Sequence, residues 1–190
     1  MDFWQVLRER RSSRQFKEAA VEENKLIKVL EAAALAPSPA NRQPWEFVVV
    51  RNQELKMRIF DASNKAREHL FRVSGWRWLG KYRVDFLKQA SVLVAVVGDP
   101  EKTGADRLFP GRGEGYQHAC AAAVQNMLLA AQAQGLGSLW FSLYDHKEMA
   151  DLLRLGQNKE VLAIVCLGYS MDDTPRPPKQ DVQGKIRFMD

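Results

Sequence analysis

The chain has 190 residues, 46% hydrophobic and 27% charged, a composition typical of a globular protein large enough to bury one core. No apolar run reaches the roughly 18–20 residues of a transmembrane helix, and the N-terminus lacks the pattern of a signal peptide. The net charge of +5 and the pI of about 9.3 are compatible with an anionic partner, either a polymer or a small phosphate compound.

Apolar periodicity predicts helices and strands that interleave within one unit, so we expect a single domain over residues 1–190. Asp2 is a suitable cap for the first helix, and Pro37 ends the second. In chain order we expect a helix over 3–10, extended chain over 12–17, a helix over 22–36, a strand over 45–51 with a continuous buried run at 47–50, a helix over 53–72, a strand over 91–97, a helix over 115–134, a strand over 138–143, a helix over 146–155 and a strand over 161–169.

Three stretches lie outside this pattern. Residues 73–87 mix aromatic and basic side chains without a clear period, which predicts a flap or an irregular helical excursion. Residues 98–115 are rich in glycine, proline and charge and predict a long loop, which in a compact domain is usually functional or disordered. The tail, 170–190, has too little apolar content to fold alone, and we expect it to pack as an arm on a partner subunit.

The helix over 115–134 is dominated by alanine and other apolar residues on every side. A helix of this kind must be buried all round, which a domain of this size achieves most simply with a partner subunit. The sequence therefore predicts a dimer, and a central core helix in a monomer is the alternative.

Cysteine and histidine spacing gives no sign of a metal site or a catalytic triad. Cys120 and Cys166 lie in apolar segments and are expected to be buried free thiols of a reducing, cytoplasmic compartment. His69, His118 and His146 are scattered, and we expect each to be structural. No Gly-x-Gly-x-x-Gly motif is present, which excludes a Rossmann domain for a nicotinamide cofactor.

The first candidate ligand site is the run Arg-Arg-Ser-Ser-Arg-Gln-Phe at residues 10–16. Arg10, Arg11 and Arg14 supply guanidinium forks and Ser12 a hydroxyl, which together suit a phosphate dianion. A solvated or salt-bridged arginine cluster is the alternative interpretation.

The second candidate is the run Ala-Pro-Ser-Pro-Ala-Asn-Arg-Gln-Pro-Trp at residues 36–45. Its prolines stiffen the loop, and Ser38, Asn41 and Gln43 offer neutral hydrogen-bonding groups. An amide both donates and accepts, which suits the imide edge of a flavin or a nucleobase. A turn whose polar groups satisfy its own backbone is the alternative.

The third candidate is the apolar helix at 125–131, followed by a Gly-Leu-Gly turn at 135–137 and a strand ending in aromatic residues. Backbone N–H groups at the end of this strand could face a planar ligand. In this order the three candidates resemble the nitroreductase family. The resemblance covers nearly the whole chain and rests on Arg-Arg-Ser-x-Arg-x-Phe, Ala-Pro-Ser-x-x-Asn-x-Gln-Pro-Trp, Gln-Asn-Met-Leu-Leu-Ala-Ala, the Gly-Leu-Gly turn and the strand end Gly168-Tyr169.

This resemblance implies an α+β sandwich, with a mostly antiparallel central sheet flanked by helices, in an intertwined homodimer with two FMN sites at the subunit interface. By resemblance, Arg10 and Ser12 hold the phosphate, Arg14 approaches the N1/O2 side of the flavin, residues 37–41 line the site from the partner chain, and a backbone N–H near 142–143 meets flavin N5. The residues expected to bind FMN are Arg10, Arg11, Ser12, Arg14, Pro37, Ser38, Pro39, Asn41, Trp140, Phe141, Ser142, Leu143, Lys185 and Arg187.

Lys185 and Arg187 match a Lys-x-Arg pair that returns to the phosphate in some members. The chain departs from the family pattern at Ser142-Leu143, where many relatives carry glycine, and over 62–90, where no motif aligns. The resemblance implies hydride transfer from NAD(P)H by a ping-pong mechanism to a nitroaromatic, a quinone or a similar small electrophile, without a catalytic side chain. Alternatives are reductive dehalogenation, flavin fragmentation, or a nucleic-acid-binding module using the basic aromatic segment 72–86.

Overall fold

A four-stranded antiparallel sheet forms the centre of the molecule, with the strand order β1-β2-β4-β3. The computed structural model describes residues 1–172 and 178–189. The strands span Trp45–Val50 (β1), Val92–Gly98 (β2), Gly137–Phe141 (β3) and Glu160–Gly168 (β4). The expected α+β class and antiparallel sheet are confirmed.

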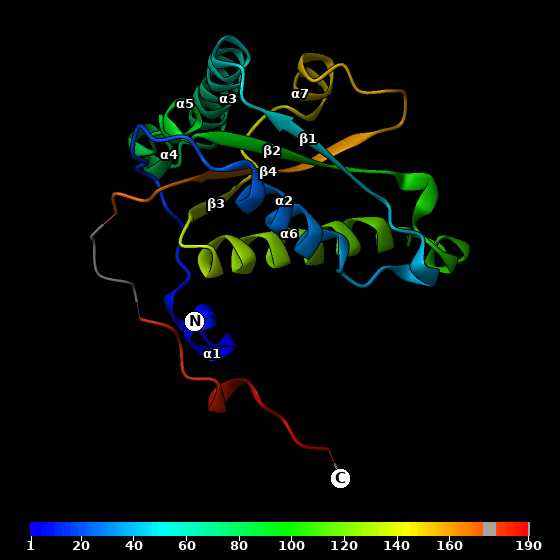
Figure 1. Ribbon diagram of the computed structural model, residues 1–190. Coiled ribbons are helices and arrows are strands. Elements are labelled where there is room, and N and C mark those ends of the chain that lie inside the picture. Colours follow the sequence, from blue (N-terminus) through cyan, green and yellow to red (C-terminus); the bar gives the residue numbers. More distant parts are fainter. Residues whose placement is uncertain (173–177, 190) are drawn as a thin grey trace.

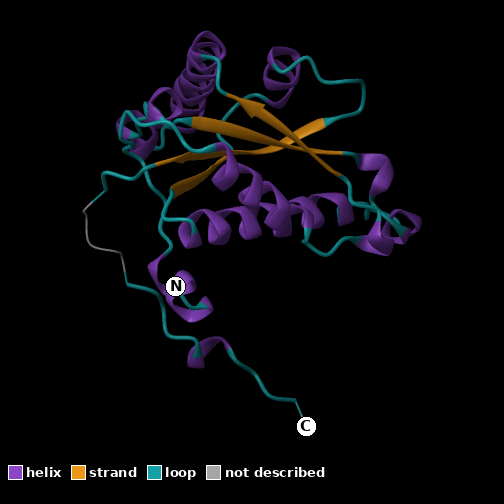
Figure 2. Cartoon of the chain, viewed as in Figure 1, coloured by secondary structure: helices purple, strands orange, loops and turns teal. Residues whose placement is uncertain are grey.

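Helices cover both faces of this sheet (Figure 1, Figure 2). They span Phe3–Glu9 (α1), Glu23–Ala34 (α2), Gln53–Ser74 (α3), Arg77–Lys81 (α4), Phe86–Gln89 (α5), Gly115–Ala133 (α6) and His146–Leu152 (α7). Short 3-10 turns span Pro39–Asn41 (η1), Pro100–Lys102 (η2), Ala105–Leu108 (η3) and Gln183–Lys185 (η4). Figure 1 shows α2 and α6 on one face of the sheet and α3, α5 and α7 on the other.

β2 contributes to the core on both faces, because successive side chains of a strand point in opposite directions. Val92, Val94 and Val96 pack in the layer that contains α2 and α6. Leu93 and Ala95 pack in the layer that contains α3 and α5. Burial on both faces explains why this strand has a continuous apolar sequence instead of an alternating one.

Local sequence signals set several element boundaries. The Asp2 carboxylate accepts a hydrogen bond from the Gln5 N–H at 2.9 Å and caps α1. α3 runs two residues past its expected end at 72, and Gly75 ends it in the left-handed conformation, with φ of 66°. The continuous burial expected over 47–50 is wrong, because β1 is an edge strand: Val50 is buried, Phe47 and Val48 are half-buried, and Val49 is exposed.

α6 is not buried all round in a single chain, and its full burial against a partner subunit stays a prediction. Its inner face is buried, but Gln117, His118 and Gln125 are exposed and Leu129 is only half-buried. Gln117, His118 and Gln125 form a polar strip, which is hard to recognise in the sequence because most of the helix is alanine and other apolar residues. The alanine-rich composition of α6 therefore gives only weak support for a dimer.

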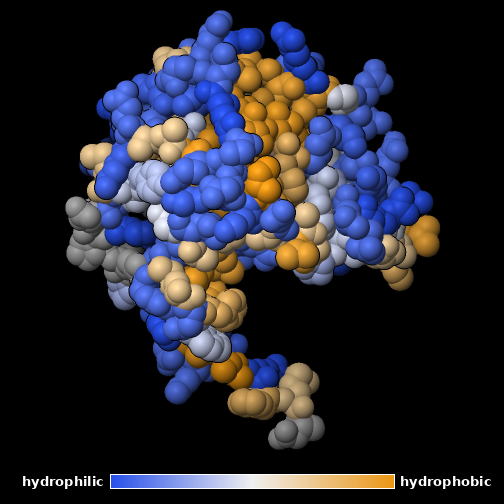
Figure 3. Space-filling model, viewed as in Figure 1, coloured by the Kyte–Doolittle hydropathy of each residue, from blue (hydrophilic) through white to orange (hydrophobic). Residues whose placement is uncertain are grey.

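The C-terminal residues 178–189, called here the arm, leave the body beyond α1 (Figure 1). Val182 and Ile186 are exposed, and Phe188 is 84% exposed. Figure 3 shows hydrophobic side chains on the arm, which stands clear of the body. Packing of the arm on a partner stays a prediction. None of the helices within 1–172 and 178–189 has the length and apolar character needed to span a bilayer.

Burial of the two cysteines leads to a prediction about their reactivity. Both are free and fully buried, and burial raises the pKa of the Cys120 thiol to about 12 and that of Cys166 further. Since the thiolate is the reactive form, neither thiol should react with a disulfide reagent such as DTNB at pH 8 in the native protein. Both should react after unfolding without reductant. Fewer than two reactive thiols in the unfolded chain would contradict this.

Candidate functional site

Residues 10–16, called here the arginine segment, lie along the edge of the sheet where β3 begins. Ser12 forms a parallel bridge with Ser138, and the Ser13 N–H donates to the Ser138 carbonyl at 2.9 Å. Phe16 forms an antiparallel bridge with Ser170 and its side chain is buried in the core. The segment is extended, as expected, and its backbone is fixed to the sheet.

Asp172 orders the cationic part of this segment. Its carboxylate accepts the Arg14 N–H at 2.6 Å and the Gln15 N–H at 3.4 Å, and its carbonyl accepts from Arg11 Nη1 at 3.3 Å. The half-buried Arg10 guanidinium makes no hydrogen bond or ion pair within the described parts of the chain. Arg10 is therefore available to an anion, whereas Arg11 is already engaged.

A tight contact holds the arginine segment against β3. Ser13 is 1% exposed, and its hydroxyl has no hydrogen-bond partner among the described residues. A Cβ at Gly137 would lie 2.7 Å from Ser13 Oγ and 2.8 Å from the Cβ of Ser170. Only glycine at position 137 lets the two backbones approach this closely.

The end of β3 presents unpaired backbone donors. The ladder ends at Phe141, two residues before the expected end, so Ser142 and Leu143 lie beyond it. Their N–H groups find no acceptor within residues 1–172 and 178–189. The Phe141 ring packs edge-to-face on Phe86 at a centroid distance of 5.4 Å, so only its backbone can face a ligand. Trp140 is exposed on the opposite side of the strand.

Residues 36–45, called here the proline loop, have a strained backbone. Ala40, Asn41 and Gln43 have φ values of 48°, 52° and 44°, which β-carbon sterics disfavour. Ser38 Oγ accepts the Gln43 N–H at 3.0 Å, and Asn41 Oδ1 accepts from Gln43 Nε2 at 3.2 Å. Part of the loop's polar capacity thus satisfies the loop itself. Strain of this kind is concentrated at functional sites in proteins.

The sheet register places the proline loop and the arginine segment at opposite ends of the sheet. The proline loop leads into β1 at Trp45, which pairs with Gly98 at the end of β2. The arginine segment joins Ser138, which pairs with Leu167 opposite Val92 at the start of β2. Of the three sequence candidates, the structure therefore brings together the first and third but not the second.

Lys185 and Arg187 of the arm, which were expected to return to the phosphate, also do not pair with the arginine segment. The side chains of Lys185 and Arg187 form no hydrogen bond or ion pair with any described residue. Their backbone leaves the body with the arm (Figure 1).

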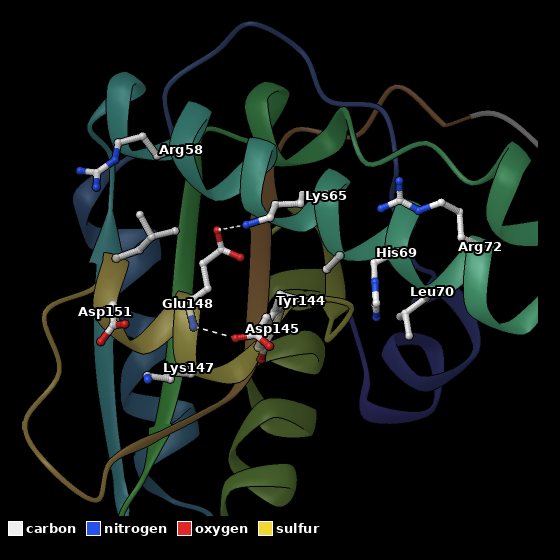
Figure 4. Close-up of a pocket in the computed structure, with 12 residues that line it drawn as sticks. Arg58, Lys65, His69, Leu70, Arg72, Tyr144, Asp145, Lys147, Glu148 and Asp151 are labelled. Atoms are coloured by element: carbon white, nitrogen blue, oxygen red, sulfur yellow. Dashed lines mark hydrogen bonds and ion pairs between the residues drawn. The ribbon is translucent and has the colours of Figure 1, made fainter.

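A cleft with a volume of about 740 Å³ lies between α3 and α7, and it was not predicted from the sequence (Figure 4). Tyr144, one of its lining residues, directly follows Ser142 and Leu143, whose backbone N–H groups are unpaired among the residues that the structure describes. An ion pair of 3.3 Å between Lys65 and Glu148 crosses the cleft. Tyr144 donates its hydroxyl to the Val161 carbonyl, and burial raises its pKa well above the ordinary value. No motif marks this cleft, because its walls come from the faces of two helices.

The family model of the nitroreductase family matches residues 7–169, which include both the arginine segment from Arg10 and the proline loop. The chain belongs to the nitroreductase family. A relative from Archaeoglobus fulgidus, named as a candidate NADH dehydrogenase/NAD(P)H nitroreductase, is 31% identical over 168 residues, which cover 86% of this chain and 83% of the relative.

Other similar proteins carry names of different chemistry. The 5,6-dimethylbenzimidazole synthase of Rhodospirillum rubrum is 27% identical over 172 residues, covering 88% of this chain and 82% of the relative. The structure of oxidized iodotyrosine deiodinase bound to FMN and 3-iodo-L-tyrosine superposes with a TM-score of 0.80 at 26% identity, covering 94% of this chain and 95% of that one. Membership of the family therefore fixes the fold but leaves the specific reaction open.

The close contact at position 137 leads to a prediction about stability. Replacing Gly137→Ala forces the added methyl group into Ser13 and Ser170, and overpacking of this kind costs about 1–3 kcal/mol. The free energy of unfolding, measured by urea titration, should fall by that amount. Gly156→Ala is the matched control, because a Cβ there has no neighbour within 4 Å. Equal stability of the two variants would contradict the contact.

Proposed function

We propose that this protein binds FMN at a site completed by a second copy of the chain, and that it transfers reducing equivalents from NAD(P)H to a small electrophilic acceptor. One observation carries the proposal. Two of the three segments that resemble the family's FMN-binding motifs meet along β3, and the third lies at the opposite end of the sheet. One chain cannot close this site, and a second copy supplies the missing loop.

The dimensions of β3 suit FMN. Ser138 adjoins the arginine segment, and Ser142 lies four residues further on, about 14 Å at the rise of about 3.4 Å per residue. FMN could span this distance, with its phosphate near Arg10 and Ser12 and its ring near Ser142. The half-buried Arg10, with no partner among the described residues, is suited to a phosphate. Lys185 and Arg187 of the arm are further candidates for the phosphate.

The unpaired N–H groups of Ser142 and Leu143 support a ring site beside them. A backbone donor there can bind flavin N5, and glycine is not required because a backbone N–H is present in any residue except proline. The backbone N–H of Arg14 is bound by Asp172, and the residue is exposed. Arg14 is therefore the candidate cation for the N1/O2 edge of the flavin. The partner's proline loop would contribute Pro37, Ser38, Pro39 and Asn41.

Bound FMN would accept a hydride from NAD(P)H and pass it to an acceptor such as a nitroaromatic or a quinone. The residues of this chain then have to bind and orient FMN and stabilise the charge of the reduced ring. None has to act as a nucleophile or general base. The described residues contain no group of three His, Cys, Asp or Glu side chains placed to hold a metal. We propose that donor and acceptor use one slot in turn, which gives ping-pong kinetics.

Absorbance and turnover of the purified protein test this function. We expect bound flavin with the absorbance bands of FMN, bleached by NAD(P)H without oxygen and restored by a nitroaromatic or a quinone. A colourless protein that gains no bands with added FMN would overturn the proposal. Reduction by NAD(P)H with turnover only of a halogenated aromatic, or with loss of the flavin itself, would favour the dehalogenating or flavin-fragmenting alternatives.

Sharing of the site predicts a stable dimer. The chain should have the mass of two copies at low micromolar concentration with FMN bound, measured by light scattering. The exposed apolar side chains of the arm and of α1, such as Phe188 and Phe3, supply surface that a partner would cover. A monomer that keeps its FMN would contradict the shared site.

Replacing Arg10→Ala should weaken FMN binding. A charge-assisted hydrogen bond contributes about 1.5–3 kcal/mol, so the affinity should fall roughly ten- to a hundredfold. Turnover of the fraction that retains flavin should change little. Titration of apoprotein with FMN measures this, and Lys28→Ala, which removes an exposed cation from α2, is the control. Unchanged FMN affinity of the Arg10 variant would show that the phosphate binds elsewhere.

Replacing Arg14→Gln should leave much of the FMN affinity but lower the two-electron potential. The oxidised ring is neutral and gains little from a cation, whereas the reduced ring is anionic and is stabilised by it. For a two-electron couple about 30 mV corresponds to roughly 1.4 kcal/mol, so we expect a decrease of tens of millivolts. A redox titration with a reference dye measures the change. An unchanged potential with severe loss of FMN would assign Arg14 to the phosphate instead.

A further inference from the structure

Residues 76–83, called here the strap, hold two tryptophan side chains out into solvent beside α3. Trp76 is 60% exposed and Trp78 is 52% exposed, whereas Leu79 between them and α3 is 2% exposed. Arg67 Nη1 donates to the Leu79 carbonyl at 2.9 Å, and a Cβ at Gly80 would lie 3.3 Å from the Phe71 ring. The strap is thus anchored on its inner side, and its outward indoles are not needed for that anchoring.

The strap region also carries cations without compensating acids. Arg72 at the end of α3, Arg77 and Lys81 form no hydrogen bond or ion pair with the residues that the structure describes. Arg83 differs, because its Nε pairs with the Asp85 carboxylate at 2.9 Å. Uncompensated cations beside exposed aromatic rings favour a ligand that is both anionic and planar.

A chain of ring contacts relates the strap to the end of β3. Trp78 contacts Tyr82 at a centroid distance of 5.7 Å, Tyr82 contacts Phe86 at 6.3 Å, and Phe86 contacts Phe141 at 5.4 Å. Phe141 directly precedes Ser142, where the flavin ring is proposed to bind. Three ring-to-ring steps therefore separate the two places, which is within the reach of one extended dinucleotide.

We propose that the strap binds the adenosine half of NADPH, with an indole stacked on the adenine and with Arg72, Arg77 and Lys81 contacting its phosphates. This inference rests on the proposed function and adds the identity of the reductant, NADPH in preference to NADH. Base stacking on an aromatic side chain and guanidinium contacts to phosphate are the two interactions that such a ligand needs. The 2′-phosphate, present only in NADPH, gives the third cation a partner.

The sequence supports a surface site of this kind for a second reason. A chain without a Gly-x-Gly-x-x-Gly turn has no Rossmann phosphate cradle, so the adenosine half of the nucleotide has to bind outside such a motif. Together with Arg72 of α3, the strap combines uncompensated cations with exposed indoles within twelve residues of sequence, 72–83. Single-stranded nucleic acid has the same two chemical features and is therefore an outcome of the test.

The first experiment compares kcat/KM of the flavin-loaded enzyme for NADPH and NADH with one acceptor. We expect a preference for NADPH that falls about tenfold in an Arg77→Gln/Lys81→Gln variant, the loss typical of a charge-assisted hydrogen bond. Trp78→Leu should raise KM for both nucleotides with little change in kcat. Lys102→Gln, an exposed lysine of η2, is the control and should keep the preference.

The second experiment separates failure of this inference from failure of the proposed function, because it needs no turnover. Adenosine 2′,5′-bisphosphate should bind the flavin-loaded protein more tightly than adenosine 5′-monophosphate, and the Arg77→Gln/Lys81→Gln variant should lose that difference. Equal binding of the two probes, or an unchanged difference in the variant, overturns the strap assignment even if both nucleotides reduce the flavin. Displacement of the bisphosphate by a short single-stranded oligonucleotide that binds more tightly overturns it in favour of nucleic acid.

Discussion

The position of every candidate ligand group depends on the pairing of β2. This strand is buried on both faces and pairs with β1 on one side and β4 on the other, so it fixes which segments meet at each end of the sheet. At its start lie the arginine segment and the beginning of β3, and at its end lies the proline loop. A shift of register by one residue would turn its side chains to the wrong layers, which makes this arrangement costly to alter.

In the arginine segment, the residues that fix the backbone differ from the residue whose cationic side chain is left without a partner in the part of the chain that the structure describes. Ser13 and Phe16 fix the main chain by pairing and burial, which leaves the Arg10 guanidinium without a partner among the described residues. The same division occurs in the strap, where Leu79 is buried and the indoles are exposed. In both places an apolar or backbone anchor holds the segment that carries a polar or aromatic side chain, so the ligands proposed above would need little ordering of the protein on binding.

Most of the fold could be predicted from the sequence, because local signals decided it. Asp2 caps α1 through the Gln5 N–H, and the continuous apolar runs of β2 and β4 became buried strands. What could not be predicted depends on contacts between distant segments. Asp172 binds the Arg14 N–H across 158 residues, and no pattern in the tail marks it. The inward orientation of Phe141 and the polar strip on α6 likewise depend on packing that periodicity does not determine.

The separation of the proline loop from the arginine segment has a genetic consequence if two copies share each site. Every site then takes its arginine segment from one chain and its proline loop from the other. A chain whose arginine segment cannot bind FMN and a chain whose proline loop cannot bind FMN would each form inactive dimers with themselves. A mixed dimer would hold one site with both defects and one with neither, so two inactive alleles could complement each other through mixed dimers in which one of the two sites works.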